Sequence, residues 1–341
     1  MATNALGGGY RVALQGQKAL GMGHTGVALA ESAETLFFNP AGMTALQSDM
    51  ELIGGLTLLN GSTKYQNELS NSAAETDNPT GTPLNIYYSK HHSDQLSYGI
   101  GVYTPYGNTV EWPTDWQGSH LVNYIELAAV YIQPTVAYKI DEQFSVGFGL
   151  NYVNGSVEFN RNLSASLADS DGERSNVTLK ESGVDDWGYN LGFRAKINDM
   201  IALGISYRSQ VDLKARGGKA NFENIPASLQ SLYSDTKFDA DLVLPAEWTL
   251  GLTYNLSPET VIAFDINRTN WSAYESLDIS FDNAAPDSIN PRDYEDSNIY
   301  RIGVQHQLND ALLIRAGIYR DESPVPSNRV TPETARNDSL A

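Results

Sequence analysis

The sequence has no cysteine in its 341 residues. A disulfide framework, a thiolate metal site and a cysteine nucleophile are therefore excluded. Basic residues are also scarce, with 22 Lys and Arg against 41 Asp and Glu and a formal net charge of -19. Because nucleic-acid binding requires a basic surface, we expect no nucleic-acid partner.

Histidine is almost as rare as cysteine. The five histidines are His24, His91, His92, His120 and His306. No two of them have the spacing that would place two metal ligands on one helical face. The acidic stretch DSDGE at 169–173 also lacks the spacing and the distal glutamate of an EF-hand calcium loop. We expect neither a metal nor a cofactor.

Long apolar runs are missing as well. No stretch reaches the roughly 18 apolar residues of a transmembrane helix. The start, MATNALGGGY, lacks the charged and apolar regions of a secretory signal, so we expect a cytosolic protein or a mature sequence with an added Met1. A membrane barrel remains possible, because its strands cross with about 10 alternating residues and can keep the average hydropathy of a soluble protein.

One glycine pattern resembles a nucleotide-binding turn. GMGHTG, residues 21–26, has the form G-x-G-x-x-G. A dinucleotide site also needs an apolar strand before the glycines and an acidic residue roughly 20 positions after them. Gly16 and Lys18 interrupt the preceding segment, and residues 46–48 are Leu, Gln and Ser. We therefore interpret these glycines as structural.

From residue 50 onward, apolar and polar residues alternate. In WGYNLGFRAKI, residues 187–197, every second side chain is apolar. The same period of two recurs in FSVGFGLNY, IALGISYRSQV, WTLGLTYN, VIAFDINRT, YRIGVQHQL and LLIRAGIYR. Such strands suit either a sheet with one face in water or a barrel with one face in lipid.

Connection lengths favour the barrel. Tight joins occur at 91–94, 140–143, 197–199, 256–259 and 308–310, and they alternate with long polar joins at 61–82, 105–126, 155–186, 212–245 and 270–297. An outer-membrane barrel has short turns at one rim and long loops at the other, whereas a soluble sandwich has no reason for this asymmetry. Tyr152, Trp187, Trp248 and Trp271 near strand ends are typical of interfacial girdles. We predict an all-β fold, a transmembrane antiparallel β-barrel over 46–341.

The first 45 residues do not share this alternation. They are rich in glycine and small residues and precede the first strand, ELIGGLTLL. A segment of this size at the start of a barrel fits inside the lumen, where close packing favours Gly and Ala. We predict that 1–45 forms a lumenal hatch.

The hatch segment carries a family resemblance. LGMGHTGVALAESAETLFFNPAGMTAL resembles the N-terminal hatch of the outer-membrane long-chain fatty acid and hydrocarbon transporters of the FadL and TodX type, with the hallmark element at Asn39, Pro40, Ala41 and Gly42. YGIGVYTPYG, LPAEWTLGLTYNLS, TNWSAYESLDISF and LLIRAGIYRDESPVP follow in the family's order. The resemblance implies a barrel of fourteen strands, whereas we count about eleven. RVTPETARNDSLA looks like a loop before another strand, so we expect that C-terminal strands are missing and that the chain does not close by itself.

The resemblance also implies a function. It implies passive transport of hydrophobic molecules, above all long-chain fatty acids, across the outer membrane by a monomer in contact with lipid and lipopolysaccharide. Cargo would be captured between the loops at 155–186 and 212–245 and would pass a shifting hatch. Aromatic hydrocarbon uptake and a non-specific porin are alternatives within transport. A lipid hydrolase is disfavoured because no G-x-S-x-G elbow is present, so we expect no catalytic residues.

Two groups of residues are candidates for cargo binding. In FENIPASLQSLY, Ile225, Leu229 and Leu232 recur at helical spacing and could form an exposed apolar stripe for an acyl chain, or pack on the rim. A carboxylate also needs a cation, and the arginines on inward faces are Arg194, Arg208, Arg301 and Arg315. Arg194 and Arg208 lead because a tight turn joins their strands. Each arginine could instead pair with a lumen acid such as Asp265.

Overall fold

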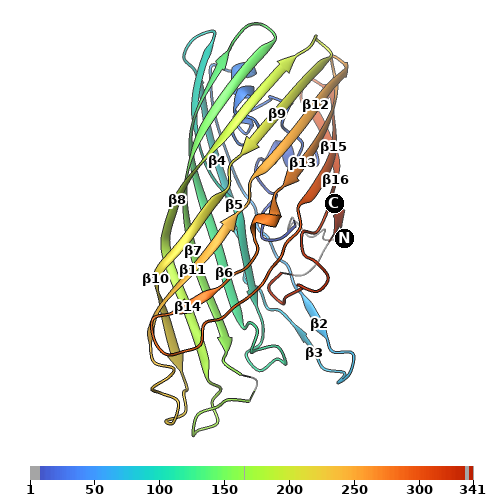
Figure 1. Ribbon diagram of the computed structural model, residues 1–341. Helices are drawn as coiled ribbons and strands as arrows, with labels where there is room; N and C mark the ends of the chain where they lie inside the picture. Colours follow the sequence, from blue (N-terminus) through green and yellow to red (C-terminus); the bar gives the residue numbers. More distant parts are fainter. Residues whose placement is uncertain (1–7, 165, 335–337, 341) are drawn as a thin grey trace.

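The computed structural model describes residues 8–164, 166–334 and 338–340. Residues 1–7 of the predicted hatch and 335–337 of the final motif lie outside the described residues. One antiparallel sheet dominates the chain and curls around the N-terminal segment (Figure 1). Among the described residues, no helix is long and apolar enough to cross a membrane.

The main path of the sheet follows the order of the sequence. Its strands are β1 Met50–Leu56, β4 Leu84–His91, β5 Leu96–Glu111, β6 Tyr124–Lys139, β7 Phe144–Asn162, β8 Asn176–Lys196, β9 Ile201–Arg208, β12 Glu247–Ser257, β13 Thr260–Thr269, β15 Ser297–Asn309, β16 Leu312–Asp321 and β17 Ser339–Leu340. Three strands lie off this path, β10 Val211–Glu223, β11 Thr236–Leu244 and β14 Ile279–Phe281, and β2 Lys64–Gln66 pairs with β3 Ala73–Glu75 alone. Within the described residues the two ends of the path do not pair with each other.

The predicted alternation of faces is confirmed. On β9, the side chains of Leu203 and Ile205 point outward, and these residues expose 39% and 40% of their surface. Ser206, the next residue after Ile205, points to the other face and exposes 7%. The same outward apolar face continues at Leu250 on β12 and Ile266 on β13. An apolar surface that extends over adjacent strands is suited to lipid rather than to water.

Several predicted loops are wrong in part, because the strands extend further than the alternation does. β7 continues to Asn162 and β8 begins at Asn176, inside the predicted loop 155–186. β10 and β11 occupy most of the predicted loop 212–245, and they pair with each other. Beyond the lipid, a strand keeps its backbone pairing but no longer needs an apolar outer face. The hydropathy pattern therefore ends before the strand does.

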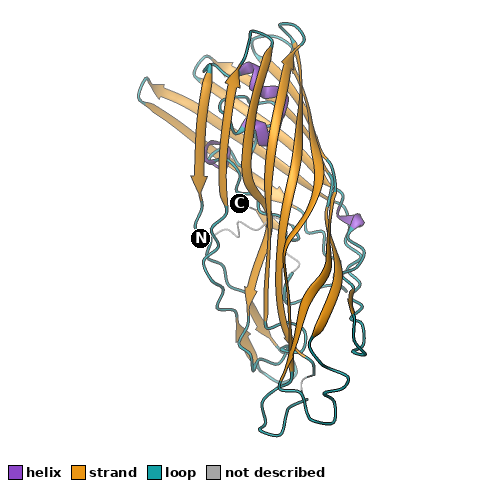
Figure 2. Ribbon diagram, turned by 90° about the vertical axis from the view of Figure 1, so that its left-hand side faces the viewer, coloured by secondary structure: helices purple, strands orange, loops and turns teal. Residues whose placement is uncertain are grey.

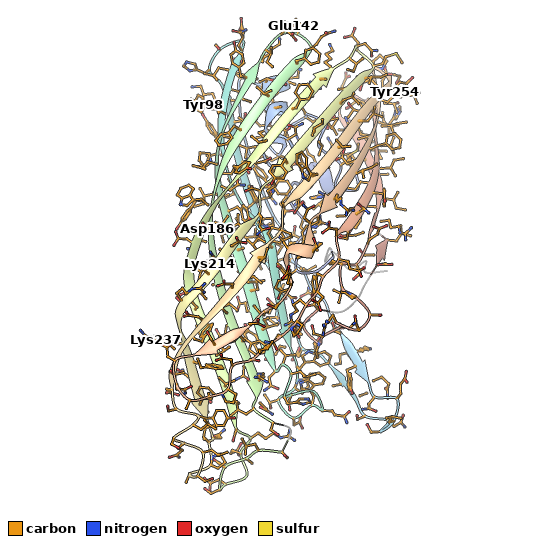
Figure 3. The ribbon with its side chains drawn as sticks, in the orientation of Figure 1. Tyr98, Glu142, Asp186, Lys214, Lys237 and Tyr254 are labelled. Atoms are coloured by element: carbon orange, nitrogen blue, oxygen red, sulfur yellow. The ribbon has the colours of Figure 1, made fainter. Side chains whose placement is uncertain are left out.

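The tight turns gather at one end of the sheet. Figure 3 places Glu142, in the turn between β6 and β7, and Tyr254, near the end of β12, at that end, with Lys237 on β11 toward the other. On the outer face, Tyr152 lies 5.0 Å from Trp187 and Tyr207 lies 4.4 Å from Trp248, measured between ring centroids. These pairs form an aromatic girdle.

Trp271 does not belong to this girdle, contrary to the prediction. Its side chain is fully buried at 0% exposure, in the short helix η2 Trp271–Ala273. Its ring packs 4.8 Å from Tyr10, edge to face. The sequence places Trp271 directly after an alternating strand, but that position does not show whether the side chain turns outward or into the lumen.

The N-terminal segment lies within the curve of the sheet. We call residues 8–45 the hatch segment. It contains the helices α1 Gln17–Leu20 and α2 Thr35–Phe38 and the 3-10 helix η1 Pro40–Ala45. Figure 2 shows these short helices inside the sheet, nearer the end with the tight turns. The hatch segment therefore fills the interior of the curved sheet only at the end with the tight turns.

We predict that the two faces of β9 respond differently to substitution. Leu203→Arg should lower the free energy of unfolding by about 2 to 4 kcal/mol, because the charge enters the lipid-facing band. Ser206→Ala, on the inner face, should have a much smaller effect. Urea titration of the protein in lipid vesicles measures both, and equal losses would show that the faces are assigned incorrectly.

Candidate functional site

The hatch segment meets the sheet at a row of inward-facing glycines. We call this row the inner glycine belt, and its members are Gly147, Gly192, Gly204, Gly251, Gly303 and Gly317. A Cβ atom at each of these positions would lie between 2.0 and 2.9 Å from an atom of the hatch segment. The belt consists of three facing pairs, because Gly147 lies opposite Gly192, Gly204 opposite Gly251 and Gly303 opposite Gly317. Only glycine permits this approach of one backbone to another.

The glycines of GMGHTG allow close packing both against the sheet and within the hatch segment. Gly23 has a φ of 64°, in the left-handed region, and a Cβ there would lie 2.8 Å from the Ile318 nitrogen of β16. A Cβ on Gly26 would lie 2.6 Å from the Phe38 ring. Close packing thus accounts for a pattern that resembles a nucleotide turn.

Asn39 joins three parts of the structure. Its Nδ2 donates to the Val27 carbonyl at 2.7 Å and to the Phe193 carbonyl of β8 at 2.9 Å, and its Oδ1 accepts from the Ala41 N–H at 3.1 Å. Pro40 follows as the first residue of η1, and the extended φ of -157° at Asn39 is the conformation that a following proline favours. Since Asn39 is fully buried, each of these bonds replaces one to water.

Three of the four predicted ligand arginines bind the hatch segment. Arg194 Nε donates to the Ala28 carbonyl at 3.1 Å, and Arg315 Nη2 lies 3.5 Å from Glu31 Oε2. The structure therefore gives Arg194 and Arg315 protein partners, and it does the same for Arg208.

Arg208 has the most complete surroundings of the four. Its Nη2 donates to the Phe37 carbonyl at 2.9 Å and its Nη1 donates to the Tyr103 hydroxyl at 2.6 Å. The guanidinium also stacks over the Phe37 ring, 4.6 Å from its centroid. Arg208 is 6% exposed, so it is held between the hatch segment and β5.

Arg301 differs from the other three. Among the described residues it forms no hydrogen bond and no ion pair. It lines a small cavity between the hatch segment and the sheet, together with Asp265. Asp265, which we expected to pair with an arginine, instead accepts from the backbone N–H groups of Gly26 at 2.8 Å and Val27 at 3.2 Å.

The segment of the predicted apolar stripe, in the loop at 212–245, does not form the helix that its spacing predicted. The segment after β10 forms turns, with Leu229 N–H bonded to the Pro226 carbonyl and Leu232 N–H bonded to the Leu229 carbonyl. Ile225 is buried, and Leu229 and Leu232 are half-buried. None of the three lines the cavity of about 300 Å³ that is described next.

A cavity with a volume of about 300 Å³ lies on the loop side of the hatch segment. We call it the outer pocket. Its apolar lining includes Leu127, Val157, Leu179, Leu213, Phe238 and Ile279, from strands β6, β7, β8, β10, β11 and β14. Tyr10 of the hatch segment also lines it. A cavity with this lining can hold an apolar molecule at the size typical of ligand sites.

Two arginines give the outer pocket a polar side. Arg161 Nη1 donates to the His120 carbonyl at 3.2 Å and its Nη2 donates to Ser288 Oγ at 3.4 Å, and no acidic residue among those described forms an ion pair with it. Burial lowers the pKa of Arg161. Arg292, by contrast, forms an ion pair with Glu333 at 2.7 Å. The outer pocket therefore contains one neutralised arginine and one without a counter-charge.

Other polar atoms at this pocket also have no partner. His120 Nδ1, Arg292 Nε and Thr331 Oγ1 are buried without a hydrogen-bond partner, and all three residues line the outer pocket. A buried polar atom without a partner costs free energy unless water or a ligand satisfies it. The pocket is thus equipped for a molecule with an apolar body and a polar end.

Sequence analysis did not identify Arg161 or Arg292. Both lie in segments that the alternation assigned to long loops. Charged residues are common in polar loops, so neither arginine stands out there. One available signal was the presence of Val157, Phe159 and Leu163 around Arg161, within an otherwise polar loop. Folding together strands from distant parts of the chain is what converts these residues into a pocket.

The family described as outer membrane protein transport protein (OMPP1/FadL/TodX) matches residues 1–339. The chain is 22% identical to "Outer membrane protein P1" of Haemophilus influenzae, over 96% of this chain and 80% of that protein. It is 21% identical to the "Long-chain fatty acid transport protein" of Escherichia coli strain K12, over 96% of this chain and 81% of that protein.

Solved structures share the fold. A FadL homologue of Pseudomonas aeruginosa superposes with a TM-score of 0.80 at 17% identity, covering 97% of this chain and 85% of that one. The toluene transporter TodX of Pseudomonas putida superposes with a TM-score of 0.70 at 19% identity, covering 92% of this chain and 85% of that one.

We predict that the inner glycine belt fixes the hatch segment. Gly204→Ala places a methyl group 2.2 Å from the Val27 carbonyl oxygen, so the hatch segment must shift. Overpacking of this kind costs about 1 to 3 kcal/mol, and backbone amides of the hatch segment should exchange hydrogen faster by a corresponding factor. Gly61→Ala is the matched control, because nothing lies within 4 Å of its Cβ position. Mass spectrometry of deuterium uptake measures both, and unchanged uptake in Gly204→Ala would contradict the prediction.

Proposed function

This chain belongs to the outer membrane protein transport protein family (OMPP1/FadL/TodX), and from that premise we propose that its cargo is a long-chain fatty acid bound first in the outer pocket. It is an outer-membrane transport protein and not an enzyme. The relatives include both fatty acid and toluene transporters, so the family alone does not choose the cargo. The observation that carries the proposal is the unpaired Arg161 at an apolar cavity.

The apolar lining of the outer pocket is an argument for a cargo with an acyl chain. Leu127, Val157 and Leu179 come from three adjacent strands, and Leu213 and Phe238 complete the enclosure. An acyl chain leaving water gains about 0.8 kcal/mol for each buried CH₂ group. Transfer into this pocket is therefore favourable without any specific contact.

The positive charge of Arg161 is an argument for a cargo with a carboxylate head group. A guanidinium at a partly desolvated site binds a carboxylate through charge-assisted hydrogen bonds in a forked geometry. Arg161 meets this need, since its described partners are a carbonyl and a hydroxyl rather than an acid. A neutral aromatic hydrocarbon would leave the charge of Arg161 uncompensated.

Passage toward the hatch segment requires movement of an aromatic floor. Tyr10 lies 6.1 Å from Tyr106, 4.8 Å from Trp271 and 5.4 Å from Tyr274, measured between ring centroids. Trp271 and Tyr106 are almost completely buried. We propose that cargo waits on this floor until the hatch segment shifts, so that the lumen does not conduct solutes as an open porin would.

We predict that Arg161 distinguishes a fatty acid from a hydrocarbon. Arg161→Gln should weaken oleate binding by about 1.5 to 3 kcal/mol, because a charge-assisted hydrogen bond is lost, and should leave binding of a matched alkane nearly unchanged. Arg174→Gln is the control, since Arg174 is an exposed arginine outside the outer pocket. Calorimetric titration of the unaltered protein and of both variants with each ligand measures the affinities.

Three results would contradict the proposal. Equal losses for oleate and the alkane would assign Arg161 a structural role. Unchanged oleate binding in Arg161→Gln would place the head group elsewhere, and tighter binding of toluene than of oleate by the unaltered protein would favour an aromatic cargo.

A further inference from the structure

Three lysines lie side by side on the outer face of the sheet. Lys219 of β10 lies directly opposite Lys180 of β8 on one side and directly opposite Lys237 of β11 on the other. All three are exposed, whereas the adjacent residues Ala220 and Phe238 point inward and are buried. We call Lys180, Lys219 and Lys237 the lysine row.

The lysine row is electrostatically unfavourable by itself. Side chains directly opposite each other on neighbouring strands lie about 4.5 to 5.5 Å apart at Cβ, and like charges in such pairs destabilise a sheet. Lys180 forms an ion pair with Glu158 at 2.6 Å, but Lys219 and Lys237 form no ion pair among the described residues. A bound anion would remove the repulsion that remains, so the row is suited to a negatively charged partner.

The next outward residues along the same strands carry amide and hydroxyl groups. Tyr124 of β6 lies opposite Asn160 of β7, which lies opposite Thr178 of β8, which in turn lies opposite Asn221 of β10. Asn160 Nδ2 donates to Thr178 Oγ1 at 2.8 Å. We call these four residues the polar level. Because amides and hydroxyls both donate and accept hydrogen bonds, the polar level is suited to the hydroxyl groups of a saccharide.

The height of the lysine row places it above the lipid. Tyr152 belongs to the aromatic girdle, and Glu158, the ion-pair partner in the row, follows it by six residues on β7. At about 3.3 Å per residue and a strand tilt of about 40°, this distance corresponds to about 15 Å along the membrane normal. Figure 3 likewise shows Lys237 farther from the end with the tight turns than Asp186, which precedes Trp187 of the girdle. Since a head-group layer is only about 5 to 8 Å thick, the row lies beyond the phosphate of an ordinary phospholipid.

We propose that the lysine row and the polar level form a docking surface for the phosphorylated core saccharide of lipopolysaccharide. This glycolipid of the outer leaflet extends a phosphorylated saccharide past the head-group layer, to the height of the row. A phosphate group beside Lys219 is within reach of three ammonium groups and compensates their charge. The sugar that carries it meets the amides and hydroxyls of the polar level. None of these residues lines the outer pocket, so the inference goes beyond the proposed transport of cargo.

Binding of lipopolysaccharide to the full chain in detergent micelles tests the docking surface. The double variant Lys219→Gln with Lys237→Gln should weaken binding of a lipopolysaccharide with core phosphates by about tenfold or more, since charge-assisted hydrogen bonds are lost. The matched control is Lys139→Gln with Lys196→Gln, which removes the same charge from two lysines at the end with the tight turns. Lys219→Arg with Lys237→Arg keeps both charges and should retain binding. Fluorescence titration with labelled lipopolysaccharide measures all of these affinities.

Two further ligands identify the group that the row binds. The same lipopolysaccharide after removal of its core phosphates should bind the unaltered protein about as weakly as the phosphorylated form binds Lys219→Gln with Lys237→Gln. Lipid A alone, which lacks the core saccharide, should bind equally to the unaltered protein and to that double variant. Oleate binding should be the same in both proteins, and Arg161→Gln should bind lipopolysaccharide normally, so that failure of this inference is distinguishable from failure of the proposed function.

Four outcomes would overturn the docking surface. Unchanged binding in Lys219→Gln with Lys237→Gln would remove the row from the contact, and equal weakening in the control pair would assign the effect to net charge alone. Loss of lipid A binding in Lys219→Gln with Lys237→Gln would show that the row contacts the membrane surface instead of the core saccharide. Full competition by inorganic phosphate would make the row a site for the free anion.

Discussion

The direct contact between the hatch backbone and the inner glycine belt sets the geometry of the lumen. A side chain at any belt position would occupy space that the hatch backbone now fills. With the backbone so close, carbonyl groups of the hatch segment come within reach of inward side chains such as Arg194 and Arg208. The same placement brings the extended segment at 10–12 onto β5, where it becomes the floor of the outer pocket. Packing at one end of the lumen thus defines the cavity at the other.

The lumen arginines fall into two groups once that packing is in place. Arg194, Arg208 and Arg315 contact the hatch segment, and their charges or hydrogen-bond donors are used by protein groups. Arg161 and Arg301 line cavities, and among the described residues neither forms an ion pair. Transport of an amphipathic acid needs cations that are available, spaced along the route and not so strongly paired that cargo cannot displace their partners. Under the proposed function, Arg161 would meet that requirement.

The sequence predicts some levels of this structure better than others. The inward or outward direction of Leu203 and Ser206 follows from the period of two, because lipid imposes an apolar outer face. The upper parts of β7, β8 and β10 were missed because that constraint ends above the lipid. The direction of Arg208 was predictable, but its partner Phe37 is 171 residues away, so only the fold reveals the contact. Arg161 was missed for the same reason, since its pocket is assembled from six strands.

A structure of the protein with 12-bromododecanoate would test the cargo and its orientation together. The anomalous signal of bromine locates the tail end without ambiguity, and the density of the acid locates the head group. We expect the carboxylate within hydrogen-bond distance of Arg161 and the bromine among the apolar residues of the outer pocket. Bromine beside Arg161, or a ligand bound only outside both cavities, would contradict the proposed capture of a fatty acid by its head group.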